Sequence, residues 1–413
     1  MVGTGVFTTS GFALKDLGSP WAVLLAWVVG GVLAAMGALC YGALGRRLPE
    51  SGGEYLFLAR TLHPAAGFIA GWLSLLVGFS APMAAAAFGF GAYAQPWLGD
   101  VSPRVPGTIL MVLFGVLHAF PVRRGAAVQN AVVLLKVLLI VGLVVYAIGR
   151  LPDLPPLTWA PATGSAFAIT LVWVSFSYSG WNAAVYVAGE IVDPDRNLPR
   201  SLLLATGFVT VLYVALNAIF VFSAPLERLA GQLDVARIAA EALGGSKLAS
   251  LVSAVILLAL ATSVSSLAMA GPRVCSRMAA DGWLPRSLAA GDGPPRWAIG
   301  LQILVATAML WTSAYEALLT YIGFTLSLST AATVFGLMRL RQREGPGLPV
   351  PGWPWLPASF IGAVLAIAAF TIFQRPIESM LGAATIGLGW LAWAVQRRSS
   401  TSLGSAPADP SSR

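Results

Sequence analysis

The sequence is poor in charge, cysteine and histidine, and each shortage excludes a class of protein. Only 10% of its 413 residues are charged, 57% are hydrophobic and the mean hydropathy is +0.79. Because soluble domains carry about 25% charged residues, this composition indicates a membrane protein. Two cysteines in or beside apolar runs, Cys40 and Cys275, cannot form a disulfide framework. His63 and His118 lack metal-ligand spacing and no nucleophile lies beside a base, so we expect no metal, no cofactor and no enzymatic activity.

Most of the chain consists of apolar runs of about 18 to 25 residues, the length needed to cross a hydrocarbon core of about 30 Å. The pattern predicts an all-α polytopic membrane protein with about 12 spans, the first of them partial. The spans are expected at residues 1–14 (partial), 21–45, 65–95, 106–121, 126–149, 163–189 (broken), 200–223, 247–271, 297–313, 316–338, 356–374 and 377–396.

The basic residues predict how the chain is oriented. If the loop after span 21–45 is cytoplasmic, 17 lysines and arginines fall on the cytoplasmic side, 7 fall on the other side and Lys136 is left inside a span. This bias follows the positive-inside rule and places the C-terminus in the cytoplasm. The basic residues are scattered over short loops, which argues against nucleic acid as a partner. We expect a multi-pass protein of the inner or plasma membrane, with no cleavable signal peptide.

Polar and small residues interrupt the apolar run of span 163–189 at its midpoint. A broken helix exposes backbone groups that cost several kcal/mol each in lipid, so the break has to line an enclosed cavity. Such discontinuous helices hold substrate near the midplane in secondary transporters. Phe176 could gate that cavity or pack within the helices, and Asn182 needs substrate or a neighbouring helix as its partner. The interrupting residues are Ser175, Ser177, Ser179, Gly180 and Asn182.

A second interruption lies at Gly3, Thr4 and Gly5, where an ordinary span would carry leucine or isoleucine. Two glycines around a hydroxyl let the backbone unwind, and the freed N–H groups can bind an anion such as a carboxylate. The alternative is a face of small residues that packs against another helix. The sequence begins almost on this motif, so we expect the first half-helix to be absent and this exact polypeptide to transport poorly.

The two interruptions predict an internal repeat. The second break, at Ser179-Gly180-Trp181, begins about five spans after the first, an odd number that would place the two copies inverted across the membrane. We therefore expect a first repeat at 1–150 and a second at 151–345. Two extra spans would follow at 346–398, and a Ser/Pro-rich, disordered tail at 399–413.

Lys136 is the only lysine or arginine deep within a span, about 15 Å along it at about 1.5 Å per residue. Ionisable residues at this depth are candidates for a functional site. Lys136 could exchange a proton or replace a bound cation, or it could serve structurally by donating to helix-end carbonyls, and these roles are compatible. Four hydroxyls could form a sodium site, hold Lys136, or bond back to their own helix: Thr262, Ser263, Ser265 and Ser266.

Four segments resemble the amino acid–polyamine–organocation superfamily of transporters. They are MVGTGVF, NAVVLLKVLLIV, FSYSGWNAAVYVAGEIVDPDRNLPRSL and AGPRVCSRMAADGWLP. Within that superfamily the chain is most similar to the L-type amino acid transporters and to bacterial serine/threonine exchangers. The resemblance implies a five-plus-five inverted-repeat fold followed by two C-terminal helices. Gly189-Glu190 departs from the pattern, because many relatives have two glutamates there.

The resemblance also implies residue roles. Backbone amides around Gly3, Thr4 and Gly5 would bind the substrate α-carboxylate. Carbonyls at the break that contains Gly180 would bind the α-ammonium. Phe176 matches a gating aromatic and Asn182 an asparagine beside the pocket. Lys136 matches a lysine that replaces the sodium of related transporters. The carbonyls in question lie near Phe176, Ser177 and Ser179, and Ser263 and Ser265 form a possible second cation site or lysine-partner site.

These features together predict a sodium-independent amino acid transporter that works by alternating access, as an exchanger or a proton symporter. No acidic residue lies near either break to select a cationic side chain, so neutral amino acids are the expected cargo. Sodium symport is the alternative, and a sensor or an intramembrane enzyme is a more distant one. L-type relatives often pair with a single-span glycoprotein through a disulfide. No cysteine lies in an outer loop here, so we expect no disulfide-linked partner subunit, and the expected partners are an amino acid substrate and the lipid bilayer.

Overall fold

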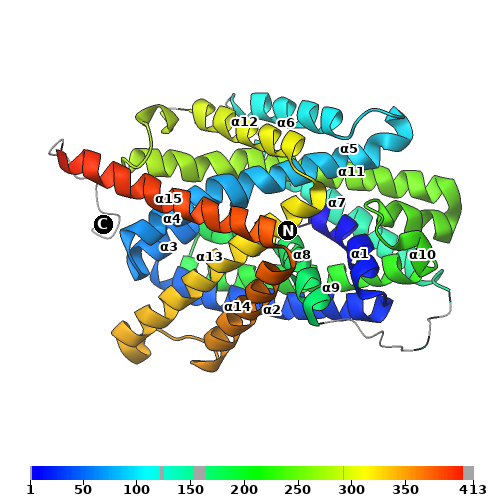
Figure 1. Ribbon diagram of the computed structural model, residues 1–413, viewed down its shortest axis with the longest axis horizontal. Coiled ribbons are helices and arrows are strands. Elements are labelled where there is room, and N and C mark those ends of the chain that lie inside the picture. Colours follow the sequence, from blue (N-terminus) through cyan, green and yellow to red (C-terminus); the bar gives the residue numbers. More distant parts are fainter. Residues whose placement is uncertain are drawn as a thin grey trace.

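The computed structural model is helical throughout the residues that it describes, which are 2–120, 125–152, 154, 156, 164–291 and 293–402, and no strand is found among them (Figure 1). The α-helices are α1 (Thr4–Leu17), α2 (Pro20–Arg47), α3 (Gly53–Thr61), α4 (Pro64–Leu73), α5 (Ala81–Leu98), α6 (Arg104–His118), α7 (Gly125–Ile148), α8 (Gly164–Tyr178), α9 (Pro194–Phe222), α10 (Leu226–Leu229), α11 (Val235–Ala280), α12 (Arg296–Thr312), α13 (Tyr315–Glu344), α14 (Trp355–Gln374) and α15 (Pro376–Ser402). A π-helix, η1 (Ser74–Ser80), joins α4 to α5, and short 3₁₀ helices are η2 (Ala183–Glu190), η3 (Arg286–Leu288) and η4 (Gly345–Gly347).

The all-α membrane fold predicted from hydropathy is confirmed. In the described part of the chain, seven helical stretches are long and apolar enough to cross a membrane, and α6 and α8 are shorter apolar helices. Every predicted span overlaps a helix, but α9, α11, α13 and α15 each extend six to nine residues beyond one predicted end of their spans. The division into repeats at 1–150 and 151–345 stays a prediction, and residues 403–413 of the predicted tail lie outside the described residues.

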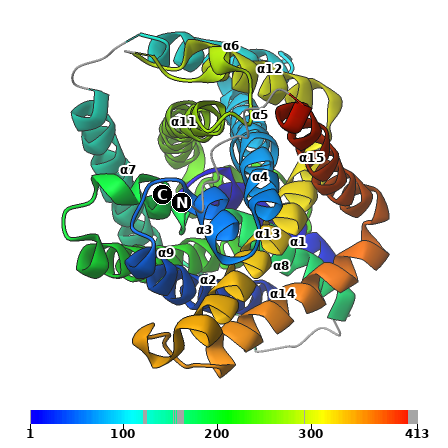
Figure 2. The same ribbon diagram turned by 90° about the vertical axis from the view of Figure 1, so that its left-hand side faces the viewer.

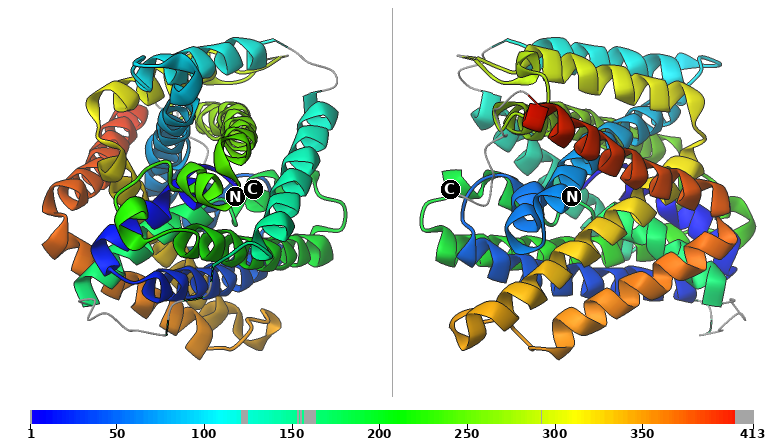
Figure 3. Two further views of the ribbon diagram at one scale, coloured as in Figure 1. Left: turned by 90° about the vertical axis from the view of Figure 1, so that its right-hand side faces the viewer. Right: turned by 60° about the vertical axis from the view of Figure 1, so that its left-hand side comes forward.

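Two central helices, α1 and α8, are enclosed by longer ones. Helix α1 packs along α8, and both contact α2. Helix α2 packs along α9, and α11 packs along α5 and contacts α1. Figures 1 and 2 show α6 and α12 side by side at one edge of the molecule, whereas α14 and α15 lie at its periphery. The N-terminus lies among the helices in Figures 1 to 3, so α1 begins inside the molecule.

The longest helix, α11, consists of two helices that meet at a kink. Gly244 and Gly245 have non-helical dihedrals, with φ of 71° at Gly245, a value that glycine adopts without steric cost. The span predicted at 247–271 begins directly after this kink. Beyond it, the helix continues to Ala280 and carries Arg273 and Arg277 past the predicted end of the span.

Glycines bring α1 against the loop that follows α10. A Cβ atom on Gly11 would lie 1.9 Å from the carbonyl oxygen of Gln232. The Gly11 carbonyl accepts a hydrogen bond from the Gly231 amide at 2.7 Å. Close backbone approach through small residues is the usual way in which membrane helices pack, since lipid provides little hydrophobic drive for their association. The absence of a side chain at Gly11 therefore allows α1 to pack closely against the loop that follows α10.

Replacing Gly11 with alanine is expected to lower stability by about 1–3 kcal/mol, because the added methyl group has to displace backbone. Gly142 is a matched control, since a Cβ atom there meets nothing within 4 Å. Gly142→Ala should change stability by no more than about 1 kcal/mol. Thermal unfolding of both variants in detergent measures the difference, and equal melting temperatures would contradict the packing described for α1.

Candidate functional site

The two regions predicted as breaks lie against each other, but the first prediction is wrong for Thr4 and Gly5, which are helical, so that only Gly3 is non-helical there. Gly3 is extended, with φ of −136° and ψ of −156°, and α1 starts at Thr4. Helix α8 ends at Tyr178 and is followed by a turn in which Gly180 has φ of 92°. A Cβ atom on Gly5 would lie 2.2 Å from Ser177 Oγ and 2.7 Å from Ser177 Cα. The absence of a side chain at Gly5 is what allows the start of α1 to touch the end of α8.

A cavity of about 870 Å³ opens beside both breaks. Its volume is within the range of about 300–1,000 Å³ that is usual for small-molecule sites. Apolar side chains from α2, α7, α9 and α13 form much of its wall, and it extends to Arg273 and Arg277 near the end of α11. All of the site residues predicted from the sequence line it except Ser265. The lining set includes Gly3, Thr4, Gly5, Lys136, Phe176, Ser177, Ser179, Gly180, Asn182 and Ser263.

The start of α1 offers main-chain donors to this cavity. The first N–H groups of a helix have no intrahelical partner and carry the positive end of the helix dipole. The Thr4 hydroxyl lies 2.7 Å from the hydroxyl of Tyr315, so that side chain is engaged with α13. What α1 presents to the cavity is therefore backbone N–H, an arrangement suited to a carboxylate.

The end of α8 offers carbonyl groups. The Phe176 carbonyl accepts from the Ser179 amide at 2.9 Å, and the Ser177 carbonyl accepts from the Tyr213 hydroxyl at 3.2 Å. A carbonyl oxygen can accept a second hydrogen bond, so both can still receive a donor such as an ammonium group. The Ser177 hydroxyl donates to the Trp173 carbonyl at 2.9 Å and lies 3.0 Å from Thr9 Oγ1, which ties α8 to α1.

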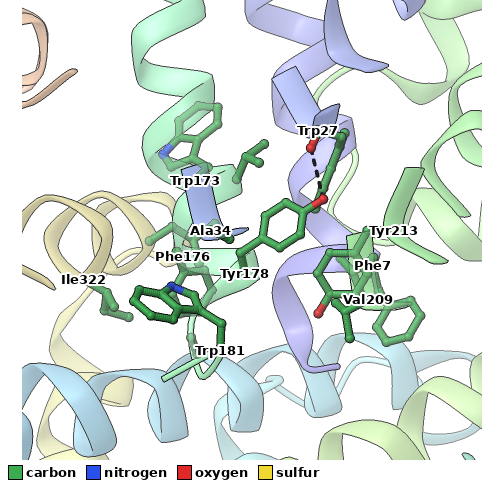
Figure 4. Close-up of a cluster of buried hydrophobic side chains, with 14 of the residues drawn as sticks. Phe7, Trp27, Ala34, Trp173, Phe176, Tyr178, Trp181, Val209, Tyr213 and Ile322 are labelled. Carbon is green, nitrogen blue, oxygen red and sulfur yellow. Dashed lines mark hydrogen bonds between the residues drawn. The ribbon is translucent and has the colours of Figure 1, made fainter. Parts of the chain in front are cut away.

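The aromatic residues at the break point in different directions (Figure 4). Phe176 is 6% exposed and lines the cavity, in keeping with either role considered for it. Tyr178 points to α2, where its hydroxyl donates to the Trp27 carbonyl at 3.0 Å. Trp181 meets Tyr41 edge to face with ring centroids 4.7 Å apart, which is a packing contact.

Lys136 holds the residue that precedes the first break. Its side chain is only 6% exposed, and Nζ donates to the Val2 carbonyl and to Thr262 Oγ1, both at 3.3 Å. Ser263 Oγ donates to the same Val2 carbonyl at 3.2 Å. The lysine thus lies where it can fix unwound backbone and also provide a positive charge beside the site. Its role in coupling stays a prediction.

The four hydroxyls of α11 bond mainly to carbonyls of their own helix. Thr262 and Ser263 both donate to the Ala259 carbonyl, at 2.8 and 2.9 Å, and Ser266 donates to the Thr262 carbonyl at 2.8 Å. Ser265 lies 2.9 Å from His118 Nε2 on α6. These hydroxyls therefore bond both to carbonyls of their own helix and to groups on other helices. Within the described part of the chain, Thr262 is the one of the four that bonds directly to Lys136.

The expectation that no acidic residue lies near either break is wrong. Asn182 donates through Nδ2 to Oε1 of Glu54 on α3, at 3.0 Å, and Glu54 is 4% exposed and lines the cavity. The two residues are 128 positions apart, so their spacing gave no indication of the contact. A local signal did exist in the sequence SGGEY, where Gly52 and Gly53 adopt φ of 149° and 57° and turn the chain back into the protein.

Aromatic rings from α1, α8 and α13 pack together outside the cavity lining. There, Phe12 packs against Trp173 and Tyr315 with ring centroids 6.0 and 6.1 Å apart. Above these rings, an oxygen of Glu316 lies 3.7 Å from a guanidinium nitrogen of Arg375. None of these five residues lines the cavity, whereas Arg273 and Arg277 do. We therefore expect the site to be reached from the Arg273 side, which the basic residues predict to be cytoplasmic.

Comparison with known proteins agrees with this geometry. The profile of the amino acid permease family matches residues 1–392. The chain is 29% identical to the large neutral amino acids transporter small subunit 2 of Mus musculus, over 94% of this chain and 77% of the relative. It is 28% identical to the Asc-type amino acid transporter 1 of Mus musculus, over 92% and 76% respectively. It is 31% identical to the b(0,+)-type amino acid transporter 1 of Rattus norvegicus, over 56% and 50%.

One-sided access predicts the labelling pattern of two single-cysteine substitutions. Ser327→Cys, in the cavity wall, should react with an impermeant maleimide only in vesicles that expose the Arg273 side. Ser102→Cys, exposed in the loop before α6, should react only in vesicles of the opposite orientation. The native Cys40 and Cys275 are buried and provide the blank. Labelling of Ser327→Cys at equal rates from both sides would contradict the closure by aromatic rings.

Proposed function

Because the chain belongs to the amino acid permease family, we propose that it is a sodium-independent secondary transporter that carries neutral amino acids across a cell membrane by alternating access. The observation that carries this proposal is the meeting of the two breaks at one cavity of about 870 Å³. Helix α1 offers unpaired N–H groups there and α8 offers carbonyl groups. These are complementary to the two charged ends of an amino acid.

The walls of the cavity support a neutral side chain as cargo. Beyond the breaks they are mostly apolar, with Leu33, Val133, Val137 and Phe208 among the lining residues. The carboxylate of Glu54 accepts bonds from three protein donors, so it is already engaged within the protein. The names of two relatives, the large neutral and the Asc-type amino acid transporters, agree with this class of substrate.

Lys136 supports sodium independence. Its ammonium group lies 3.3 Å from the Val2 carbonyl, at the backbone that a bound cation would otherwise stabilise. A sodium ion at the same oxygen would be repelled by the lysine. Sodium symport is therefore the less favoured alternative.

Alternating access follows if the two proposed repeats, residues 1–150 and 151–345, rock against each other around the breaks. The cavity reaches Arg273 and Arg277, and the opposite end is closed by Phe12, Trp173 and Tyr315. With the orientation predicted from the basic residues, this is the conformation open to the cytoplasm. Exchange and proton symport are both compatible with it.

Uptake into proteoliposomes tests the proposed function. Labelled leucine should accumulate at the same rate in sodium and in choline buffer, with internal amino acid or a pH gradient as the driving force. Empty liposomes are the control, and the absence of any amino acid uptake or binding would refute the proposal.

The substitution Lys136→Ala tests the cation-replacing role. Removing the ammonium frees the Val2 carbonyl and Thr262 hydroxyl, so uptake in choline should be lost and uptake in sodium should recover at least in part. Lys247→Ala, at an exposed position on α11, is the matched control and should behave like the parent protein. Unchanged uptake by Lys136→Ala in both buffers would exclude Lys136 from the mechanism.

A further inference from the structure

Glu54 is a buried carboxylate that joins three separate elements to its own helix. Oε1 accepts from the Tyr41 hydroxyl of α2 at 2.7 Å and from Asn182 Nδ2 at 3.0 Å. Oε2 accepts from the Ser329 hydroxyl of α13 at 2.5 Å. Since Asn182 closes the turn after α8, Glu54 is bonded directly to the second break. The side chain is 4% exposed and yet forms part of the cavity wall.

No basic side chain in the described part of the chain forms an ion pair with Glu54. Arg60, on the same helix, lies 3.8 Å from Glu50, and Arg277 of α11 lies 3.1 Å from Asp281. All three donors to Glu54 are neutral. Burying an ionised carboxylate without a counter-charge is costly, and the usual outcome is a carboxyl group that binds a proton more readily than it does in water. Helix α3 lies outside the candidate membrane spans, and burial raises the pKa of Glu54 there.

The titratable groups nearest to Glu54 are phenols, so Glu54 is the carboxylic acid among them. Tyr41 of α2 and Tyr186 of η2 are its nearest titratable neighbours, and a phenol is neutral at physiological pH. Tyr55, next to Glu54 on α3, donates to Asp281 at 2.8 Å. His63, at the start of α4, accepts from the Ala65 amide through Nδ1.

The other helices around Glu54, α13 and α11, contribute hydroxyl groups and two more distant positive charges. Helix α13 contributes the Ser329 hydroxyl, and Thr333 on the same helix donates to the Ser329 carbonyl at 3.0 Å. Helix α11 contributes Arg273 and Arg277, which line the cavity but form no ion pair with Glu54. A proton that enters the cavity from the open side therefore passes these arginines and meets Glu54 as the carboxylate in the wall.

We propose that Glu54 is the proton-binding site of this transporter and that its protonation state sets the conformation of the second break through Asn182. The inference deepens the proposed function and rests on it, since it names the proton as the coupled ion. It also differs from a role for Lys136, which is bonded to the first break instead.

The hydrogen bonds around Glu54 indicate how its protonation would change its contact with Asn182. When a proton adds to Oε2, the new O–H donates to Ser329 Oγ, which changes from donor to acceptor. Oε1 then becomes a neutral carbonyl oxygen and still accepts from Tyr41 and Asn182. A bond to a neutral acceptor is weaker than a bond to a carboxylate, so protonation loosens the hold on Asn182. No bond other than these has to break, and no co-reactant besides the proton is needed.

The substitution Glu54→Gln mimics the protonated group, because its amide nitrogen can donate to Ser329 while its oxygen accepts from Tyr41 and Asn182. In proteoliposomes the parent protein should show leucine uptake that varies at least about threefold as the pH on the cavity side changes from about 5 to about 8. With amino acid on both sides of the membrane, exchange by Glu54→Gln should be flat over this range, at the level that the parent reaches at low pH. Uptake driven by a pH gradient should be lost, because glutamine cannot bind and release a proton. Glutamate-to-glutamine substitution at Glu241, an exposed residue paired with Arg237, is the matched control and should keep the parent profile.

The substitution Ser329→Ala separates a titrating role from a structural one. Ser329 stabilises the ionised form of Glu54, so its removal should move the midpoint of the pH profile to higher pH. A residue that only holds helices together would lower the rate at all pH values without moving the midpoint. Size-exclusion chromatography and binding of labelled leucine establish that each variant is folded.

The outcomes distinguish this inference from the proposed function. If the parent protein takes up amino acid but Glu54→Gln keeps the parent pH profile, Glu54 is not the proton site, although transport stands. The same conclusion follows if the parent profile is flat, or if Ser329→Ala leaves the midpoint unchanged. If the parent protein neither binds nor takes up amino acid, the proposed function itself fails.

Discussion

Main-chain groups that lose their helical partners inside a membrane are the constraint on which this structure depends. An unpaired N–H or C=O costs several kcal/mol in lipid, so a broken helix has to be enclosed by protein. Here the start of α1 and the end of α8 are enclosed together, in contact through Gly5 and Ser177. The longer helices α2, α5, α9, α11 and α13 surround them, and the cavity lies where the free backbone groups face inward.

Each break is held by one buried ionisable side chain of opposite charge. Lys136 donates to the Val2 carbonyl before the first break, and Glu54 accepts from Asn182 after the second. Both side chains are less than a tenth exposed and line the same cavity. Ionisable groups at such positions are costly to retain, which favours a functional reading of both. They also bond to residues just outside α1 and α8, where a change in charge can alter conformation without breaking either α-helix.

The other end of the site is closed by rings rather than by charges. Phe12, Trp173 and Tyr315 meet in mostly tilted and edge-on contacts, and the Glu316–Arg375 pair lies above them. That pair is about one-third exposed, so its electrostatic contribution is small and packing of the rings accounts for most of the closure. Arg375 lies between α14 and α15, and it also stacks over Trp173 at 5.9 Å, which connects the C-terminal helices to this closure.

The sequence by itself determined the elements. Apolar runs of membrane-crossing length, with small and polar residues at Ser179–Asn182, were enough to place most of the spans, the break after α8 and the buried position of Lys136, although the predicted unwinding at Gly3–Gly5 is confined to Gly3. These follow from local composition and from the cost of exposing backbone to lipid. Which side chains meet was decided only by the tertiary structure. Glu54 and Asn182, Ser265 and His118, and Gly5 and Ser177 are each more than 120 residues apart, and they come together because helix packing, rather than sequence spacing, sets the neighbours of a buried polar group.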